Sequence, residues 1–344
     1  MFLEIPFEKT KKNIIYIDVR SEGEYEEAHI PGAVNIPLFT DEERKIIGTA
    51  YKNDSVSEAR KLGIQFASAR LPQIYEMIVN LKDSHDRQLV AYCARGGYRS
   101  TFFASAFSSI GVGVLKLDGG YKRYRNYIIE QLPELNNKLN YIVLHGNTGT
   151  GKTKVLKSLI NFGLDALDLE GAANHRGSVL GSVGLGACNS QKQLESNIFH
   201  QMQSFQTHDI FVEAESRKVG NVLVPGCIHE KMKTGVHILI EEEIDYRVKV
   251  IKEDYTQKNG FQEEILQSLL YLKKYLSKEK LDKLSQAIKE GNIDDAIADL
   301  MINYYDPLYS NKSATYDYQL ILSGLADPEK AALKIKQWFE KADK

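Results

Sequence analysis

The sequence contains few cysteines, and the three that it has, Cys93, Cys188 and Cys227, lie far apart. An odd number of scattered cysteines argues against a disulfide framework and favours a reducing compartment. Their spacing does not pair any of them as zinc ligands. With 43% hydrophobic residues, the chain is instead expected to fold by ordinary burial of apolar side chains.

Long hydrophobic runs and an excess of positive charge are also missing. No window reaches the roughly 18 consecutive apolar residues of a membrane span, and the opening residues MFLEIPFEKTKK lack the apolar stretch of a signal peptide. The formal net charge of -2 excludes a generally basic nucleic-acid binder, so any nucleic acid would have to meet a local patch. We therefore expect a soluble, cytoplasmic protein with no membrane partner.

The first 130 residues show an α/β pattern. Apolar runs such as IIYIDV (14–19) and QLVAYC (88–93) alternate with helical patterns at about 58–81 and 99–110. Strands that each lead into a helix are typical of a parallel sheet. We therefore predict a small parallel-sheet domain over residues 1–130.

A second α/β pattern fills residues 140–344, after a polar stretch, QLPELNNKL (131–139), which contains a proline and predicts a linker. Further strands are expected at YIVLH (141–145), DALDLE (165–170), DIFVEA (209–214), VHILIEE (236–242) and TYDYQLILSG (315–324). From about 256 to 306 the pattern is helical, which predicts an all-α insertion. A last helix is expected after Asp327 as N-cap, with Pro328 in its first turn.

The stretch AYCARGGYRS (91–100) places a cysteine at the end of an expected strand. A glycine-containing loop and a helix that begins near Arg99 would direct backbone N–H groups towards Cys93. Arg95 and Arg99 add positive charge, so we expect a lowered thiol pKa and a nucleophilic thiolate. The C-x5-R spacing also fits the phosphate loop of cysteine phosphatases. The alternative, a buried structural thiol, leaves both arginines without a role.

The stretch GNTGTGKT follows an apolar strand and precedes a helical pattern, as a phosphate-binding P-loop requires. It consists of Gly146, Asn147, Thr148, Gly149, Thr150, Gly151, Lys152 and Thr153. Backbone N–H groups of residues 149–153 should hold a di- or triphosphate, and Lys152 should neutralise it. The Thr153 hydroxyl could bind Mg²⁺, and no other metal ligand is assigned with certainty. No segment that would select guanine is present, so a nucleotide is not required.

Two further loops are candidate substrate sites. His175, Arg176 and Ser178 follow an expected strand and could form a second anion loop at the carboxyl edge of the sheet. The alternative is a flexible glycine-rich connection. Arg217 follows another strand end. If DIFVEAES is a Walker B strand, Glu213 or Glu215 would lie near a metal; otherwise these glutamates are simply solvated.

Three segments together resemble the signatures of a rhodanese domain. They are YIDVRSEGEYEEAHIPGAVNIP (16–37), the AYCARGGYRS loop and LDGGYKRYRNY (117–127). This resemblance implies that Cys93 carries sulfur or selenium. It also implies that Asp18, Arg20 and His29 are structural ties rather than catalytic groups.

The order of the domains extends the resemblance. A rhodanese-like domain followed by a P-loop NTPase-like domain, with LDLEGAANHRGS and FVEAESRKVG, is similar to the tRNA 2-selenouridine synthase family over essentially the full chain. The resemblance implies a transferase that acts on the wobble uridine of tRNAs of the Lys, Glu and Gln type. Geranyl diphosphate would alkylate the sulfur of 2-thiouridine, and selenophosphate would then deliver selenium.

This resemblance assigns roles to both loops. The P-loop would hold the diphosphate of the geranyl donor, while Arg95 and Arg99 would attract selenophosphate to Cys93. No tightly bound cofactor is implied, although Mg²⁺ could take part. Ala214 stands where the family pattern leads us to expect an acid, which weakens a metal role for that segment.

The tRNA surface is left open by the sequence. One candidate is a basic and aromatic cluster, formed by Lys116, Tyr121, Lys122, Arg123, Tyr124, Arg125 and Tyr127. Such a cluster suits phosphates and unstacked bases, but a solvated amphipathic helix explains it equally well.

Three other functions remain open. The first is a sulfurtransferase fused to an ATP-dependent P-loop kinase or NTPase that acts on a small molecule. The second is a cysteine phosphatase, which is disfavoured because no aspartate is placed by motif as general acid. The third is a rhodanese domain that only binds a partner.

Overall fold

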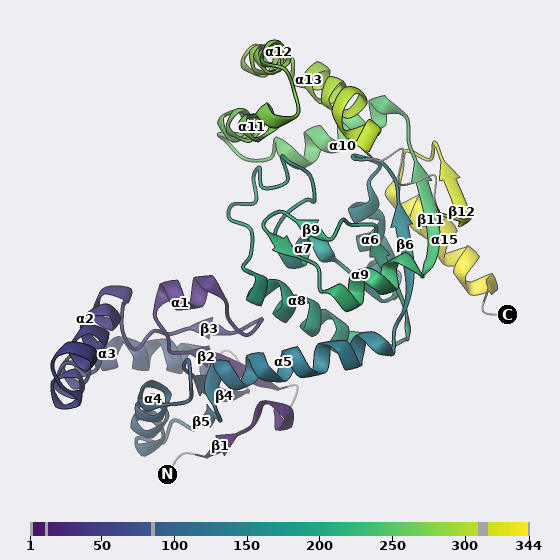
Figure 1. The fold of residues 1–344 in the computed structure, drawn as a ribbon. Coiled ribbons are helices and arrows are strands. Elements are labelled where there is room, and N and C mark those ends of the chain that lie inside the picture. The colour runs from purple at the N-terminus through teal and green to yellow at the C-terminus, as the bar shows by residue number, and fades with distance from the viewer. Residues whose placement is uncertain (1–2, 11–12, 84–86, 309–315, 343–344) are drawn as a thin grey trace. The chain divides into compact units, whose positions relative to one another are not determined.

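The structure, a computed structural model, describes all residues except 1–2, 11–12, 84–86, 309–315 and 343–344. The chain divides into two compact units, Met1–Leu132 and Pro133–Lys344. Both are α/β units built on parallel sheets, as the sequence predicts (Figure 1). None of the helices over the described residues is both long and apolar enough to cross a bilayer.

The first unit contains one five-stranded parallel sheet with the order β1-β5-β4-β2-β3. Its strands are β1 (Glu4–Ile5), β2 (Ile14–Asp18), β3 (Val34–Asn35), β4 (Gln88–Tyr92) and β5 (Val114–Leu117). Because the chain passes from β2 to β3 on one side and from β4 to β5 on the other, the carboxyl ends of β2 and β4 form a topological switch point. Cys93 follows β4 directly and therefore lies at this point.

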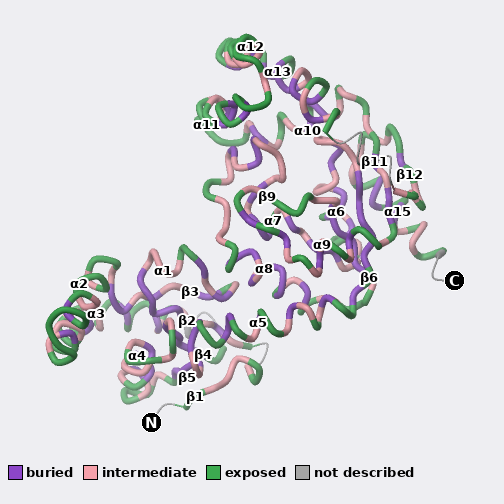
Figure 2. Tube along the Cα trace, in the orientation of Figure 1, coloured by how far each residue is buried: buried purple, intermediate pink, exposed green. Residues whose placement is uncertain are grey.

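Helices surround this sheet and build its core. They are the 3₁₀ turn η1 (Phe7–Lys9), α1 (Glu22–Glu27), α2 (Asp41–Asn53), α3 (Val56–Asp83), α4 (Tyr98–Ser109) and α5 (Gly120–Asn137). Ile17 and Ala91 of the strands pack with Phe103 and Phe107 of α4, and all four are almost fully buried. β4 is buried along nearly its whole length (Figure 2).

The stretch 131–139, predicted as a linker, contains the division between the two units after Leu132, but it is helical for most of its length because α5 continues to Asn137. Leu132, Asn136 and Leu139 are buried at helical spacing, but the middle residue is polar and hides the period. The Asn136 side chain is satisfied there: it donates to the carbonyl of Cys227 (3.2 Å) and accepts from the hydroxyl of Tyr141 (2.8 Å). A polar composition therefore masks a packed helix.

The second unit contains a five-stranded parallel sheet with the order β12-β11-β6-β8-β7. Its strands are β6 (Asn140–His145), β7 (Ala166–Leu167), β8 (Asp209–Glu213), β11 (Val236–Glu241) and β12 (Tyr318–Ser323). A short antiparallel ribbon joins β9 (Lys218–Val219) and β10 (Val222–Leu223). The chain adds β7 and β8 on one side of β6 and β11 and β12 on the other, so the strand order reverses at β6. The loop after β6 therefore lies where ligands bind in such sheets.

Two helices, α6 (Lys152–Asn161) and α15 (Pro328–Ala342), pack on one face of this sheet and share its core. The remaining helices between the strands are α7 (Leu169–Ala173), α8 (Gln191–Ser204) and α9 (Gly226–Lys233). Asp327 caps α15 as predicted, because its carboxylate accepts from the N–H groups of Glu329 and Lys330. The strand predicted at 165–170 is shorter, since β7 ends at Leu167 and Asp168 caps α7.

The helical insertion predicted at about 256–306 is present. It follows α10 (Ile244–Tyr255) and consists of α11 (Phe261–Leu269), η2 (Leu270–Lys274), α12 (Lys278–Lys289), α13 (Ile293–Leu300) and the π-helical turn η3 (Met301–Tyr305). The lobe has its own core, in which Leu272 and Leu284 pack with Leu180 and Val183 from the loop after α7. The insertion is therefore anchored on the loop that carries Ser178.

Candidate functional site

The P-loop has the strand, loop and helix context that its motif requires. The chain leaves β6 at Gly146, whose φ is 151°, and a Cβ there would lie 2.4 Å from the carbonyl oxygen of Ile240. Only glycine fits this close approach. The helix α6 begins at Lys152, so the N–H groups of its first turn and its positive end face the loop. The segment is built to hold an anion.

Lys152 lies inside this loop. Its ammonium donates to the carbonyl of Gly146 at 2.7 Å and to that of Asn147 at 3.4 Å. These contacts hold the charge over the concave side of the loop, where a phosphate oxygen would be neutralised.

Three glutamates gather next to Lys152. One carboxylate oxygen from each of Glu170, Glu213 and Glu215 lies within 4.8 Å of the others. The hydroxyl oxygen of Thr153 lies 2.7 Å from Oε2 of Glu213 and 2.9 Å from Oε2 of Glu170. Burial raises the pKa of all three carboxyls, while Lys152 opposes the shift. Repulsion from neighbouring carboxylates adds to the shift of Glu170 and Glu213, and the pKa of Glu213 rises to about 8. The cluster needs a proton or a cation to offset its charge.

A divalent cation fits this cluster. Glu213 is fully buried, and its Oε1 has no hydrogen-bond partner among the residues that the structure describes. Buried carboxylates and a hydroxyl are the hard oxygen ligands that Mg²⁺ prefers. Thr153 was predicted for this role and Glu213 and Glu215 were considered for it, whereas Glu170 was missed because its segment was predicted to be a strand.

The dependence of stability on pH and Mg²⁺ should reveal this acidic cluster. Because the folded pKa of Glu213 lies above its ordinary value, the folded state binds more protons, and stability should fall as the pH rises from about 5 to 8. We expect Mg²⁺ to raise the thermal midpoint more at pH 8 than at pH 6, since protons compete with the ion. Glu213→Gln should remove most of both effects in scanning fluorimetry, and Glu263→Gln on the exposed side of α11 should not. An Mg²⁺ response that is equal in wild type and Glu213→Gln would contradict the assignment.

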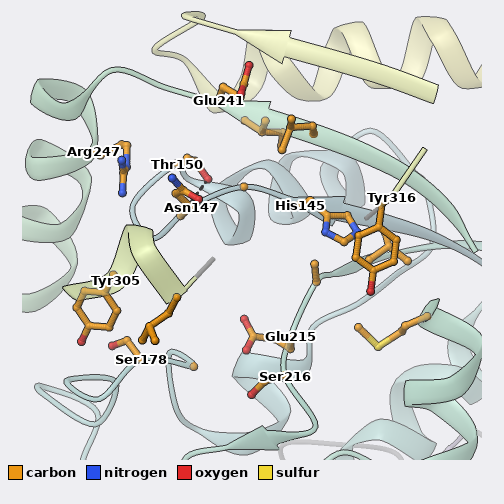
Figure 3. Close-up of a pocket in the computed structure, with 18 of the residues that line it drawn as sticks. His145, Asn147, Thr150, Ser178, Glu215, Ser216, Glu241, Arg247, Tyr305 and Tyr316 are labelled. Carbon is orange, nitrogen blue, oxygen red and sulfur yellow. Dashed lines mark hydrogen bonds between the residues drawn. The ribbon is translucent and has the colours of Figure 1, made fainter. Parts of the chain in front are cut away.

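A cavity of about 700 Å³ opens beside the P-loop. Figure 3 shows loop residues Asn147 and Thr150 in its lining, with Tyr305 and Ser178 on one side and His145 and Tyr316 on the other. Arg247 also borders it and is fixed by an ion pair with Asp306. The cavity therefore joins a polar anion site to two aromatic walls.

One aromatic wall is built on a histidine pair that sequence reasoning missed. Nε2 of His145 lies 2.9 Å from Nδ1 of His237, and both rings contact the ring of Tyr316. Burial lowers the pKa of both, that of His145 to about 3 with added repulsion from His237 and Lys152. Both imidazoles are therefore neutral near pH 7, and the wall is uncharged.

Only some residues of the predicted second substrate loop line a cavity. Ser178 lines the large cavity, and with Arg176 it lines a smaller one of about 70 Å³ next to Lys152 and Thr153. Arg176 is also a structural tie, since it donates to the carbonyls of Val183 (2.6 Å) and Asp254 (2.8 Å).

Two other predicted residues lie apart from these cavities. His175 is buried next to Gly181 and Gly220, and Arg217 is exposed before β9. Neither side chain lines either cavity. Glu215, by contrast, borders both, so it is the member of the acidic cluster that a ligand in either cavity would meet.

In the first unit, Cys93 is 3% exposed, yet it is not an ordinary core thiol. Its sulfur lies 3.2 Å from the hydroxyl oxygen of Ser100. Burial alone would raise the thiol pKa, but hydrogen bonds from Ser100 and the N–H of Arg95, with the charge of Arg99, bring it below the ordinary value. The arrangement favours a thiolate.

The start of α5 closes the cysteine loop. The N–H groups of Tyr121 and Lys122 donate to the carbonyls of Cys93 and Ala94, both at 2.9 Å. Gly120 has φ 59°, and a Cβ there would lie 2.2 Å from the carbonyl oxygen of Cys93. The LDGG segment therefore fixes the loop around the sulfur.

The two loop arginines differ. Arg99 donates to both carboxylate oxygens of Glu24, at 2.5 and 3.1 Å. Burial opposes ionisation of Glu24, but this pairing keeps its pKa below the ordinary value. Arg95 is exposed and makes no ion pair with the residues that the structure describes. Of the two, only Arg95 retains an uncompensated charge for an incoming anion.

Comparison with known proteins matches both units. A family model described as "tRNA 2-selenouridine synthase AAA domain" matches residues 139–342, and a rhodanese-like domain model matches residues 7–127. A tRNA 2-selenouridine synthase of Hydrogenovibrio crunogenus is 31% identical, over 93% of this chain and 94% of that protein. The chain belongs to the tRNA 2-selenouridine synthase family.

A second relative agrees with this assignment. A tRNA 2-selenouridine synthase of Pseudomonas syringae pv. syringae is 33% identical, over 86% of this chain and 87% of that protein. The N-terminal domain of a putative ATP/GTP binding protein from Clostridium difficile 630 is 42% identical over 38% of this chain and 99% of that chain, with a TM-score of 0.35. The family matches include both the Cys93 loop and the P-loop.

For a member of the tRNA 2-selenouridine synthase family, the basic and aromatic cluster at 116–127 offers little surface for bases. Tyr121 and Tyr124 are 7% and 1% exposed, and Lys116 is buried in an ion pair with Glu4. The polar residues Lys122 and Arg123 lie on the exposed side of α5. The segment is an amphipathic helix whose rings belong to the core.

The lowered thiol pKa of Cys93 can be tested through Ser100. We expect Ser100→Ala to raise the pKa of Cys93, because the hydroxyl that stabilises the charged sulfur is lost. Thiolate absorbance against pH, with the Cys93→Ala curve subtracted, measures the change. Thr101→Ala, on the next residue of α4, is the matched control. An unchanged titration in Ser100→Ala would contradict the assignment.

Proposed function

We propose that the protein converts 2-thiouridine to 2-selenouridine at the wobble position of tRNA, in two stages carried by one chain. Its acceptors are tRNAs of the Lys, Glu and Gln type, and it works in the cytoplasm. Membership of the tRNA 2-selenouridine synthase family supports the overall conversion. The two stages are inferred from the two anion sites.

The first stage is transfer of a geranyl group from geranyl diphosphate to the sulfur of 2-thiouridine. The C–O bond of the donor breaks, a C–S bond forms, diphosphate leaves, and the N3 proton of 2-thiouridine is released. The observation that carries this stage is the cavity of about 700 Å³, which joins the P-loop to uncharged aromatic walls. An allylic diphosphate needs both an anion site and an apolar surface, and this cavity offers both.

The residues of the P-loop have distinct parts in this stage. Backbone N–H groups at the start of α6 would bind the diphosphate oxygens, and Lys152 would stabilise the charge that develops on the leaving group. Thr153 and the glutamate cluster would hold Mg²⁺, which supplies further charge neutralisation when bound. The neutral His145–His237 pair adds no competing charge beside the geranyl group.

The second stage replaces the geranylthio group of the base by selenium. Hydrogenselenophosphate, water and the geranylated base give the selenouridine, geranylthiol and hydrogenphosphate. The Cys93 thiolate is proposed to handle the selenium, with Arg95 and the loop N–H groups attracting selenophosphate. Arg99 would act through Glu24 by shaping the loop rather than by binding the anion.

Mass spectrometry of nucleosides tests both stages. Purified protein and thiolated tRNA should give the S-geranyl nucleoside when geranyl diphosphate is supplied alone. Addition of selenophosphate should then convert it to selenouridine. Formation of selenouridine without any requirement for geranyl diphosphate would overturn the first stage. Tight binding of ATP without binding of geranyl diphosphate would favour the rival kinase or NTPase.

A further inference from the structure

We propose that the exposed turn between α11 and α12, together with Tyr304, forms an RNA-binding edge of the cavity. This aromatic edge consists of Tyr271, Lys273, Lys274, Tyr275 and Tyr304. Across it, an unpaired strand of the tRNA would reach the P-loop. The inference rests on the proposed function only in taking tRNA as the partner, and it does not depend on which donor the P-loop binds.

The turn presents two aromatic rings to solvent. Tyr271 is 73% exposed and Tyr275 is 68% exposed, while Leu272 between them is fully buried in the core of the helical lobe. The buried leucine fixes the turn, so the two tyrosines are held outward on an ordered element. Large aromatic side chains held in this way provide stacking surfaces.

From this turn a row of rings continues into the cavity. The centroid of the Tyr275 ring lies 5.9 Å from that of Tyr304, which in turn lies 5.0 Å from that of Tyr305. Tyr304 and Tyr305 both line the cavity beside the P-loop. Figure 3 shows Tyr305 close to Ser178 in this lining. A row of rings therefore runs from Tyr275 on the exposed turn to the large cavity beside the P-loop.

The charge around the turn is complementary to RNA. Five lysines and two acidic residues lie between Leu270 and Lys283, in a chain whose net charge is -2. Two of these lysines, Lys280 and Lys283, have carboxylate partners. Lys273 and Lys274 are exposed and form no ion pair within the described part of the chain.

This combination favours single-stranded RNA over other partners. Proteins that bind unpaired RNA stack bases on aromatic rings and meet the backbone with lysine or arginine. The α5 cluster has the same residue types, but Tyr121 and Tyr124 lie in the core and Tyr127 is half-buried. Between the two clusters, the aromatic edge is the one whose rings a base could reach.

Affinity for tRNA tests the aromatic edge. Binding of labelled bacterial tRNA to the full-length protein would be followed by fluorescence anisotropy over a range of salt concentrations. We expect Tyr271→Ala/Tyr275→Ala to weaken binding about tenfold or more, because base stacking is lost. Tyr275→Phe, which keeps the ring, should bind almost as wild type does.

The two lysines should affect the salt dependence of tRNA binding. Lys273→Ala/Lys274→Ala should lower the slope of log affinity against log salt by about 1.4, since each phosphate contact on a single strand accounts for about 0.7. A merely structural role would not change this slope. Lys334→Ala on the exposed side of α15 and Tyr51→Ala on α2 are the controls, since each removes an exposed residue of the same type away from the aromatic edge.

The outcomes separate the aromatic edge from the proposed function. Wild-type binding of tRNA with unchanged affinity and salt slope in both double variants would overturn the edge alone. If the same variants instead abolished self-association in sedimentation, the exposed rings would belong to a contact between copies, which also overturns it. Failure of the wild-type protein to bind tRNA would overturn both. Binding of inorganic diphosphate should be unchanged in every edge variant.

Discussion

Replacing Lys152 with alanine is expected to lower geranyl transfer to tRNA by roughly 10²- to 10³-fold, the usual cost of one donor aimed at developing charge. The ammonium of Lys152 lies 2.7 Å from the carbonyl oxygen of Gly146, so it is held over the P-loop before any substrate arrives. The charge on the departing diphosphate would develop there. Release of diphosphate and yield of the S-geranyl nucleoside both measure the effect.

The variant should also disturb the acidic cluster. Lys152 lowers the pKa of Glu170, Glu213 and Glu215, so its removal should raise these values further. Lys157→Ala, on the exposed side of the same helix, should retain full activity. Geranyl transfer by Lys152→Ala at the wild-type rate, with the fold intact by circular dichroism, would rule out the proposed role of the P-loop.

The strands and both loops could be predicted because their signals are local. Apolar runs such as 88–93 and 141–145 fix β4 and β6, and the parallel arrangement follows from the helical patterns between strands. The P-loop and the Cys93 loop each combine a strand end, glycines and a helix start within ten residues or so. Glycine spacing determines such turns with little help from the rest of the chain.

Other features depend on residues that meet only in the folded chain. Thr153 and Glu213 are 60 positions apart, and His145 and His237 are 92 apart. Each pair forms because β6 lies between β8 and β11, an order that no local pattern encodes. The histidine wall and the place of Glu170 in the acidic cluster were therefore beyond sequence reasoning.

Arg99 illustrates the same limit for charge. Its position in C-x5-R suggests an anion ligand, but Glu24, which is 75 positions away, occupies both of its terminal nitrogens. The charge of Arg99 still lowers the pKa of the Cys93 thiol, although the carboxylate of Glu24 already compensates this charge. A motif gives the residue type and spacing, whereas the partner of a charge depends on tertiary packing.

Replacing Cys93 with alanine is expected to abolish selenouridine formation and to leave geranyl transfer unchanged. The thiol has a lowered pKa and lies in a loop closed by the start of α5, whereas the geranyl donor is assigned to the second unit. The S-geranyl nucleoside should therefore accumulate when both donors are supplied. Nucleoside mass spectrometry of one reaction mixture reports both yields.

The matched control is Cys227→Ala. Burial raises the pKa of Cys227, so its thiol is protonated near neutral pH, and its loss should leave both yields intact. Alanine at position 93 also removes a buried sulfur from the core, at a cost of about 1 kcal/mol, which a thermal melt will register without loss of the fold. Equal selenouridine yields from wild type and Cys93→Ala would show that selenium reaches the base without this sulfur. A parallel loss of geranylation would instead mean that the cysteine loop serves both stages, because only separate sites allow one product to accumulate while the other disappears.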